Sequence, residues 1–414
     1  MVVLVVVHQE VAGGVKRKLN LWFHIMFRRS SPPRPHWQQL AKETGFNFHT
    51  MHGETYWDES VYYQFTLQQI EQDIEDPSVE LNQMLLELVA KVCDDDELMQ
   101  LFAIPEQQWD LIRRSWFRRD PHLYGRFDFS YNSNGPAKLL EANFDTPTSL
   151  FEAGYFQWRW LEDMVDAGQL PRQSDQFNAL QEALIKHFRQ LHRFHRAQRL
   201  YFSCCKDTQE DLGTVEYMRS CAMEAGLKTG FCFVEDIGLN DANQLTDLNN
   251  NPMSWMFKLY PWEFMFTDEF APALSNLKMQ WLEPAWKAII SNKAILPLLW
   301  QMYEGHPNLL PAYFSKDKHK LDTAAGIVKK PLFSREGANI EITKAGKTLS
   351  RSGGDYGDEG FIYQAFHALP NFDGNYPLIG SWMVKDEAVA MSIREDSSLI
   401  TQDLSRFVPH IILG

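Results

Sequence analysis

Residues 124–146 constrain the fold of this chain most strongly, because they have the pattern of a β-hairpin with polar side chains on one face. They read YGRFDFSYNSNGPAKLLEANFDT, and the Asn134-Gly135 pair is typical of a turn between two strands. Side chains alternate between the faces of a strand, so each predicted strand separates its polar from its apolar side chains. The polar positions that share a face within each strand are Arg126 and Asp128, then Glu141, Asn143 and Asp145.

This polar face predicts a site for a cation and a phosphate. Asp128, Glu141 and Asn143 offer the oxygen ligands that Mg2+ prefers, and Mg2+ usually completes its shell with water and phosphate oxygens. Arg126 would add a guanidinium, which can donate two parallel hydrogen bonds to the oxygens of a phosphate. The alternative is a solvated sheet face with ordinary cross-strand ion pairs. Sequence does not set the register of a hairpin, so both interpretations stay open at this point.

A second candidate site lies further along the chain in residues 327–340, IVKKPLFSREGANI. Lys330 ends a predicted strand, and Arg335 and Gly337 follow in a loop where a glycine lets backbone N–H groups approach an anion. The segment is not a P-loop, because it lacks the GxxxxGK[ST] order. Lys293 would be a third cation. The predicted strand 361–366 offers backbone groups that could read an adenine edge.

The rest of the chain predicts a mixed α+β protein. Thr66 and Gln69 form a capping-box pattern that starts a helix, and Pro77 is expected to separate it from a second helix. Further helices are expected over 150–166 and 176–199, and we interpret the basic residues and three histidines of the latter as a solvated face. Strands are predicted near residues 124–131, 138–144, 199–204, 231–235, 327–330, 340–343 and 361–366.

Charge and cysteine content limit the partners of the protein. The chain has 40 Lys and Arg against 54 Asp and Glu, so its net charge is −14, which argues against nucleic-acid binding. A small anion is still allowed, because a ligand meets the local field. Five cysteines fit no disulfide or zinc spacing, and no apolar run is long enough to cross a membrane. We therefore expect a cytoplasmic protein with reduced thiols and no membrane partner.

Residues 1–36 differ in composition from the rest of the chain. They hold six basic residues against one acidic residue, and they end in the rigid sequence SSPPRP followed by His36. We predict a basic tail that is unstructured or arises from a non-native start. The folded domain is predicted over residues 37–414.

Eight segments, taken together, resemble the synthetase domain of glutathionylspermidine synthases, and most of all the stand-alone bacterial acid–amine ligase-like proteins of that family. The resemblance covers the chain from about Trp37 to its C-terminus. In order, the segments are YGRFD (124–128), LLEANFDTPTS (139–149), CCKDTQED (204–211), FKLYPWE (257–263), EPAWKAIISNKAILPLLW (283–300), VKKPLFSREGAN (328–339), IYQAF (362–366) and IREDSSLITQD (393–403).

The resemblance implies an ATP-grasp-type fold in which two lobes sandwich ATP. It also implies a permuted motif order, because the metal-binding Glu141-x-Asn143 precedes the nucleotide-binding Lys293 and Lys330. The implied activity is ATP-dependent acid–amine ligation, in which a carboxylate becomes an acyl phosphate and an amine then displaces the phosphate. The implied cofactors are ATP and Mg2+, and the implied partners are small carboxylate and amine substrates.

The same resemblance implies roles for individual residues. Arg126 matches the arginine that stabilises the transferring phosphoryl group, and Glu210 and Asp211 match an acidic pair that holds the amine. The Mg2+ ligands match Asp128, Glu141 and Asn143, and the substrate positions match Thr146, Thr148, Glu210, Asp211 and Arg394. The ATP contacts match Arg126, Phe127, Asp128, Lys293, Lys330, Arg335, Gly337, Gln364, Leu399, Ile400 and Thr401.

Two positions depart from the family pattern. Arg406 stands where the family has an acid that helps to hold the polyamine, and FKLYPWEF has no counterpart of a threonine near the substrate site. Nucleotide and metal chemistry are expected to be retained, whereas glutathione and spermidine are not assigned as substrates. An alternative function is a nucleotide-binding protein with residual ATPase activity and a regulatory role. A carboxylate-based hydrolase is disfavoured by the phosphate-binding pattern of Lys330, Arg335 and Gly337.

Overall fold

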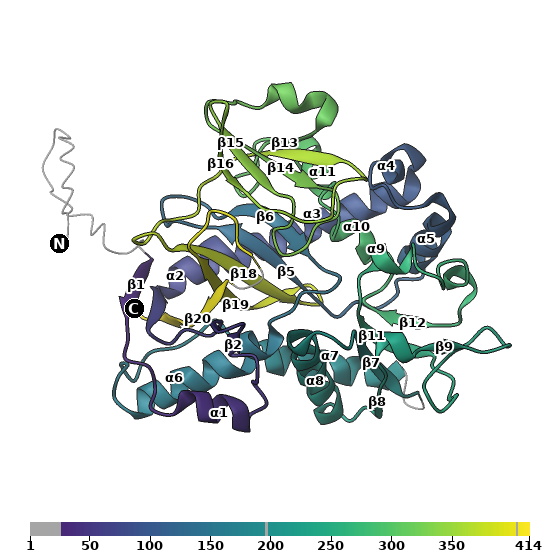
Figure 1. The fold of residues 1–414 in the computed structure, drawn as a ribbon, viewed down its shortest axis with the longest axis horizontal. Helices are drawn as coiled ribbons and strands as arrows, with labels where there is room; N and C mark the ends of the chain where they lie inside the picture. Colours follow the sequence, from purple (N-terminus) through teal and green to yellow (C-terminus); the bar gives the residue numbers. More distant parts are fainter. Residues whose placement is uncertain (1–25, 195–197, 403–404) are drawn as a thin grey trace, which may run out of the picture.

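The computed structural model describes residues 26–194, 198–402 and 405–414 (Figure 1). Within these residues, two five-stranded antiparallel sheets and one four-stranded parallel sheet form the main β layers, so the predicted α+β class is confirmed. The helices are α1 (Trp37–Glu43), α2 (Leu67–Ile70), α3 (Asp76–Asp94), α4 (Asp96–Gln100), α5 (Trp109–Phe117), α6 (Gln157–Asp166), α7 (Leu180–Phe194), α8 (Gln209–Glu224), α9 (Trp262–Met265), α10 (Lys287–Ile290) and α11 (Ile295–Met302).

The central sheet contains the polar hairpin of the sequence. Its strand order is β20-β19-β18-β5-β6, and every neighbouring pair is antiparallel. Phe127 and Phe129 lie fully buried in the core, as the alternation along the first strand predicts. The bounds are β5 (Tyr124–Ser130), β6 (Lys138–Asn143), β18 (Tyr376–Val384), β19 (Glu387–Asp396) and β20 (Arg406–Val408).

An upper sheet lies above the central sheet in Figure 1 and carries the second candidate site. Its order is β13-β17-β14-β15-β16, and all of its pairings are antiparallel. The loop between β14 and β15 contains Arg335 and Gly337. The bounds are β13 (Ala312–Phe314), β14 (Ile327–Pro331), β15 (Glu341–Lys344), β16 (Lys347–Arg351) and β17 (Phe361–Ala365).

A parallel sheet of order β12-β11-β7-β8 lies beside the central sheet (Figure 1). Helix α8 connects β7 to β8, which is the crossover that parallel neighbours require. The predicted strand at 231–235 is shorter and earlier, because a 3-10 turn begins at Val234. The bounds are β7 (Leu200–Cys204), β8 (Thr229–Phe231), β11 (Trp255–Leu259) and β12 (Gln280–Leu282).

The predicted break at Pro77 is wrong. The Thr66 capping box starts α2 as predicted, but the chain then runs through a π-helical turn, Glu71–Glu75, directly into α3. Pro77 occupies the first turn of α3. Proline has no N–H to donate, and a helix tolerates it where the backbone pattern changes and the first N–H groups lack intrahelical partners. A local widening of the helix therefore replaces the predicted gap.

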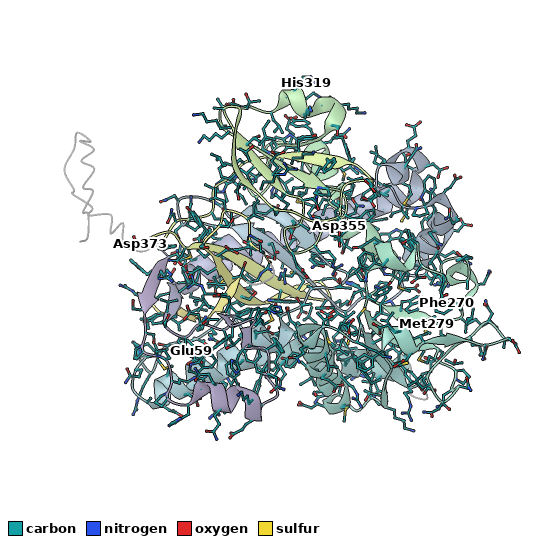
Figure 2. All side chains as sticks on the ribbon, in the orientation of Figure 1. Glu59, Phe270, Met279, His319, Asp355 and Asp373 are labelled. Atoms are coloured by element: carbon teal, nitrogen blue, oxygen red, sulfur yellow. The ribbon has the colours of Figure 1, made fainter. Side chains whose placement is uncertain are left out.

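The folded domain begins before residue 37, so the predicted boundary is too late. Strand β1 (Phe27–Ser30) pairs antiparallel with β4 (Val61–Phe65), which also pairs with β21 (His410–Ile412). Arg34 is buried and pairs with Glu59, labelled in Figure 2, and with Asp163, both at 2.7 Å. Arg34 thus contacts carboxylates of the domain and is not part of a separate tail. The earlier part of the predicted tail, residues 1–25, lies outside the described residues.

The remaining short strands are two hairpins of two residues a side, β2 (Thr50–Met51) with β3 (Glu54–Thr55) and β9 (Gly238–Leu239) with β10 (Leu245–Thr246). The predicted helix over 176–199 is α7, which spans only part of that range. No helix among the described residues combines the length and apolar character needed to span a membrane.

Candidate active site

The register of the β5–β6 hairpin brings the four predicted polar side chains together. Arg126 lies opposite Asn143, and Asp128 lies opposite Glu141. All four line one cavity of about 940 Å3, to which both the central and the upper sheet contribute residues. Small-molecule sites commonly measure about 300–1,000 Å3, so this cavity has room for a nucleotide. The polar face is therefore the wall of a cavity and not a solvated sheet surface.

Arg126 is held on several sides. Its Nε and Nη2 donate to the two carboxylate oxygens of Asp128 at 2.6 and 3.1 Å, and its Nη1 donates to the carbonyl of Thr148 at 3.3 Å. The ring of Trp382 lies 5.3 Å from the guanidinium. Gly380 provides the necessary space, since a Cβ there would lie 2.8 Å from Cδ of Arg126. The guanidinium is thus oriented by the protein itself.

Two lysines from distant segments converge on Glu141. Nζ of Lys293 lies 3.2 Å from Oε2 of Glu141 and donates to the carbonyl of Ser334 at 2.7 Å, while Lys330 donates to the carbonyl of Leu140 at 2.7 Å. Burial would raise the pKa of Glu141, but the two lysines outweigh it and lower the pKa to about 2. Burial and the nearby Lys293 lower the pKa of Lys330 to about 8, against the opposing effect of Glu141.

The loop between β14 and β15 covers part of the cavity. Nη2 of Arg335 donates to the hydroxyl of Thr146, and Nη1 pairs with Glu263 at 3.4 Å. Gly337 adopts a φ of 69°, and a Cβ there would lie 2.6 Å from the carbonyl oxygen of Thr401. Only glycine meets both conditions, so the loop can lie directly on a segment for which the resemblance implies contact with ATP.

One end of the cavity is apolar. Gln364 is buried next to it, and its side-chain amide donates to the carbonyl of Leu139 at 3.0 Å. A flat heteroaromatic base fits an apolar slot with a few fixed polar groups. The predicted contacts Leu399 and Ile400 lie in this apolar cluster, whose other members are Val328, Ile340, Ile342 and Phe366.

Carboxylates gather at the other end, which we call the acidic end. Asp211 lines the cavity there together with the predicted substrate residues Thr146 and Thr148. Glu210 lies behind the wall, is not among the lining residues, and accepts a hydrogen bond from the Ser149 hydroxyl at 3.3 Å. Of the predicted amine-holding pair, only Asp211 reaches the cavity directly.

Glu152, a fully buried residue of the π-helical turn Glu152–Phe156, is not among the residues predicted from the sequence. The Tyr56 hydroxyl donates to Oε1 of Glu152 at 2.6 Å, while Oε2 is buried without a hydrogen-bond partner among the described residues. Burial, and then the negative charge of Glu210, raise the pKa of Glu152 to about 8. The available signal was a lone carboxylate in the aromatic run LFEAGYF.

Phe127 and Arg406 do not face the cavity. The side chain of Phe127 lies in the core, because its neighbours on β5 point the other way, and the residue does not line the cavity. Its contact with ATP stays a prediction. Arg406 pairs with Glu395 at 2.6 Å and is not a lining residue. The predicted substrate residue Arg394 does line the cavity and pairs with Asp128 at 3.0 Å.

The donor set fits the Mg2+ and phosphate that the resemblance implies. Asp128 and Glu141 face each other across the hairpin, and Mg2+ commonly binds one or two carboxylates together with phosphate oxygens. Across the described ranges, no three His, Cys, Asp or Glu side chains gather as metal ligands, so a third protein donor would be the amide of Asn143. Ser334 is also a lining residue, and its buried hydroxyl has no hydrogen-bond partner among the described residues.

Comparisons with known proteins agree with this geometry. Residues 28–413 match the family model described as glutathionylspermidine synthase, preATP-grasp. The chain is 40% identical over 390 residues to a Haemophilus influenzae protein named "Putative acid--amine ligase", covering 92% of this chain and 97% of the relative. It is 32% identical over 348 residues to trypanothione synthetase of Crithidia fasciculata, covering 78% of this chain and 52% of the relative.

A further relative is the bifunctional glutathionylspermidine synthetase/amidase of Escherichia coli, 29% identical over 378 residues, with 85% of this chain and 59% of that protein covered. The chain thus spans little more than half the length of these two larger relatives. Among solved structures, a glutathione synthetase-like effector of Globodera pallida has a TM-score of 0.53 at 11% identity, covering 84% of this chain and 89% of the other. That likeness supports the ATP-grasp-type fold.

Proposed function

The chain belongs to the glutathionylspermidine synthase family, and from this premise we propose that it is an ATP-dependent acid–amine ligase that works through an acyl phosphate. Its relatives are ligases, which supports an enzyme that forms carbon–nitrogen bonds. One observation carries the proposal. Arg126, Lys293 and Lys330 come from distant segments and converge with the oxygen donors of the hairpin on one cavity.

The end of the cavity that holds Lys293 and Lys330, which we call the nucleotide end, has the charges that a triphosphate needs. Lys293, Lys330 and Arg335 would bind phosphate oxygens, and Asp128, Glu141 and Asn143 would hold Mg2+. ATP supplies the phosphoryl group, and Mg2+ neutralises its charge. Arg126 is already oriented by Asp128, so it can stabilise charge that develops on the transferring group with little reorganisation.

The acidic end has the charges that an amine substrate needs. In the proposed reaction, a carboxylate oxygen attacks the γ-phosphorus and ADP leaves. After the bound ammonium loses one proton to water, its nitrogen attacks the acyl carbon. Phosphate leaves with the bonding electrons and takes up the second proton that the nitrogen loses. Asp211 in the cavity wall, with Glu210 behind it, would attract the ammonium form of the amine. The Arg335 loop would keep water from the acyl phosphate.

An assay of ADP release tests the proposed function. The enzyme is incubated with ATP and Mg2+ against a panel of peptides and amino acids, with and without polyamines. We expect ADP release that requires both an acid and an amine, together with formation of the amide detected by mass spectrometry. ADP release that no acid–amine pair changes would contradict ligase activity on that panel and would favour residual ATPase.

A variant of the site shows whether the measured ADP release comes from this enzyme or from a contaminating ATPase. E141Q removes one predicted Mg2+ ligand and the partner of Lys293 while keeping the side-chain shape. We expect it to lose pair-dependent ADP release at Mg2+ concentrations that saturate the wild type. Equal activity in E141Q at limiting Mg2+ would show that Glu141 is not a metal ligand in this enzyme.

A further inference from the structure

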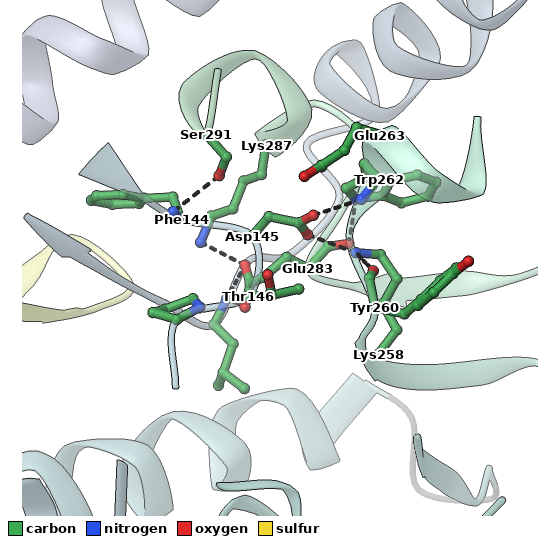
Figure 3. A network of polar contacts seen from close by, with 12 residues as sticks. Phe144, Asp145, Thr146, Lys258, Tyr260, Trp262, Glu263, Glu283, Lys287 and Ser291 are labelled. Carbon is green, nitrogen blue, oxygen red and sulfur yellow. Dashed lines mark hydrogen bonds and ion pairs between the residues drawn. The ribbon is translucent and has the colours of Figure 1, made fainter. Parts of the chain in front are cut away.

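Asp145 belongs to the polar pattern of the hairpin, yet its buried carboxylate is not part of the cavity wall. Its Oδ1 accepts a hydrogen bond from Nζ of Lys258 at 2.6 Å, and its Oδ2 accepts one from the backbone N–H of Trp262 at 2.8 Å (Figure 3). Lys258 also donates to the carbonyl of Tyr260 at 2.9 Å. The carboxylate therefore ties the end of β6 to the segment that follows β11.

Thr146 and Glu263 hold the side chain of Arg335. In sequence, each directly follows one partner of the hydrogen bond between Asp145 and Trp262. Thr146, which accepts from Nη2 of Arg335, follows Asp145 in sequence. Glu263, which pairs with Nη1 of Arg335 at 3.4 Å, follows Trp262, whose backbone N–H donates to Asp145. Figure 3 shows Asp145 lying between Thr146 and Trp262. One carboxylate is thus bonded within one residue of each of the two side chains that hold one guanidinium.

A buried ion pair is weak support for an argument about stability, because apolar residues often replace such pairs without loss. Its better attested effect is to specify one geometry among several. Lys258 and Asp145 are both almost fully buried, so neither can relax into solvent if its partner is removed. The pair lies beside Thr146 and Glu263, the two residues that hold Arg335.

We propose that Asp145, through its pair with Lys258, is a positioning residue that sets where Arg335 and its loop, residues 332–340, lie over the cavity. The inference rests on the proposed function for the meaning of that loop, but the position of the loop can be measured without turnover. The neighbouring pair of Glu283 and Lys287 provides a matched control. It is equally buried, at 2.5 Å, and Glu283 accepts from the N–H groups of Leu123 and Tyr124 instead.

Hydrogen exchange followed by mass spectrometry tests the proposal in the nucleotide-free enzyme. Reporter amides exist in the loop, since Ala338 donates to the carbonyl of Arg335 at 2.8 Å and Asn339 to that of Gly353 at 3.1 Å. We expect D145N to speed exchange over residues 332–340 by about tenfold relative to a peptide from β7. E283Q is expected to leave that ratio within about twofold of wild type. Equal loosening of the loop in both variants, or in neither, would overturn the proposal.

Arg335 provides a second test through non-additivity. R335A should itself speed exchange in the loop, and D145N should add nothing further in the R335A background, because both changes break the same connection. Additive effects would show that Asp145 acts elsewhere. If D145N folds poorly, D145N/K258M removes both charges and leaves no unpaired ammonium; loop exchange that returns to the wild-type rate in this double variant would contradict the proposal.

Steady-state kinetics gives a readout that a purely structural role would not move. With any acid–amine pair that supports ADP release, D145N should raise the KM for ATP by about five- to tenfold, and E283Q should not. Loosened loop exchange in D145N together with no acid–amine activity on any panel would refute the proposed ligase and leave the positioning role standing. Normal loop exchange in D145N, together with acid–amine ligase activity of the enzyme, would refute the positioning role and leave the proposed ligase standing.

Discussion

At the nucleotide end of the cavity a half-buried glutamate lies near two lysines, whereas behind the acidic end a buried glutamate faces a second carboxylate. Glu141 has a pKa lowered to about 2, because Lys293 and Lys330 outweigh the effect of burial. Glu152 has a pKa raised to about 8, because burial and Glu210 act in the same direction. The same side chain therefore carries a full charge at one end and a proton at the other.

The difference shows how an acidic protein can bind a polyanion. The net charge of −14 describes the whole surface, but a ligand in the cavity meets the charges that line it. Cations from separate segments gather where the phosphates are proposed to bind, and carboxylates gather where the ammonium is proposed to bind. Arg126 lies between the ends, with Asp128 on one side and the carbonyl of Thr148 on the other.

The largest effect is expected from Arg126, which connects the two ends. R126A should lower kcat by about 1,000-fold, because it removes the guanidinium proposed to stabilise the transferring phosphoryl group. ATP binding should change little, since Arg394 still pairs with Asp128 at 3.0 Å and the lysines remain. ADP release and nucleotide fluorescence titration measure the two quantities. Turnover that survives in R126A would contradict this role.

A smaller effect is expected from the pH dependence of the nucleotide end. Lys330 has a pKa lowered to about 8, so it is a cation below that pH and loses its charge above it. The Kd for ATP should therefore rise by about tenfold between pH 7 and pH 9.5, as one charged hydrogen-bond donor is lost. Isothermal titration calorimetry measures it. K330R keeps its charge over this range and should flatten the profile; an unchanged profile in K330R would exclude Lys330 as the cause.

The acidic end should respond to pH through stability instead. Glu152 keeps in the folded state, with a pKa of about 8, a proton that the unfolded chain loses at its ordinary value of 4.5. The free energy of unfolding therefore falls as pH rises from 4.5 to 8. E152Q cannot ionise, so at pH 8.5 it should be more stable than wild type by about 1–3 kcal/mol, and at pH 5 the gain should vanish.

Thermal unfolding at the two pH values measures this change. The matched control is E162Q on the exposed side of α6, which should show no such difference between the two pH values. A stability gain in E152Q that is equal at pH 5 and pH 8.5 would mean that Glu152 is ionised in the folded protein at both.

The smallest effect is expected from Cys205, which lines the cavity near Asp211. Burial, and then Glu235 and Asp211, raise the pKa of its thiol to about 11, so it is neutral and a poor nucleophile at pH 7. C205S should leave pair-dependent ADP release within about twofold of wild type. Loss of turnover in C205S, with ATP binding intact, would indicate a catalytic thiol.

Prediction from sequence succeeded where a local period decided the structure. The alternation along residues 124–130 correctly separated Arg126 and Asp128 from Phe127 and Phe129. Prediction failed at two positions. Pro77 does not break the helix, because it lies in the first turn of α3 directly after a π-helical turn. Glu152 gave no signal, because its aromatic neighbours predict only a packed helix. The strands β18 and β19 were missed because their long buried runs lack a clear alternation.

The order of residues along the chain is enough to predict the hairpin, the side chains that share each of its faces and, through several ordered motifs, the family that the chain resembles. The folded protein was needed to show that Glu141 lies between the strand partner Asp128 and the cations Lys293 and Lys330. It was also needed to show that Asp145 turns from that face to an ion pair with Lys258. The cause of this division is distance along the chain. A period of two is set by neighbouring residues, whereas these contacts join segments whose approach depends on sheet pairing and burial.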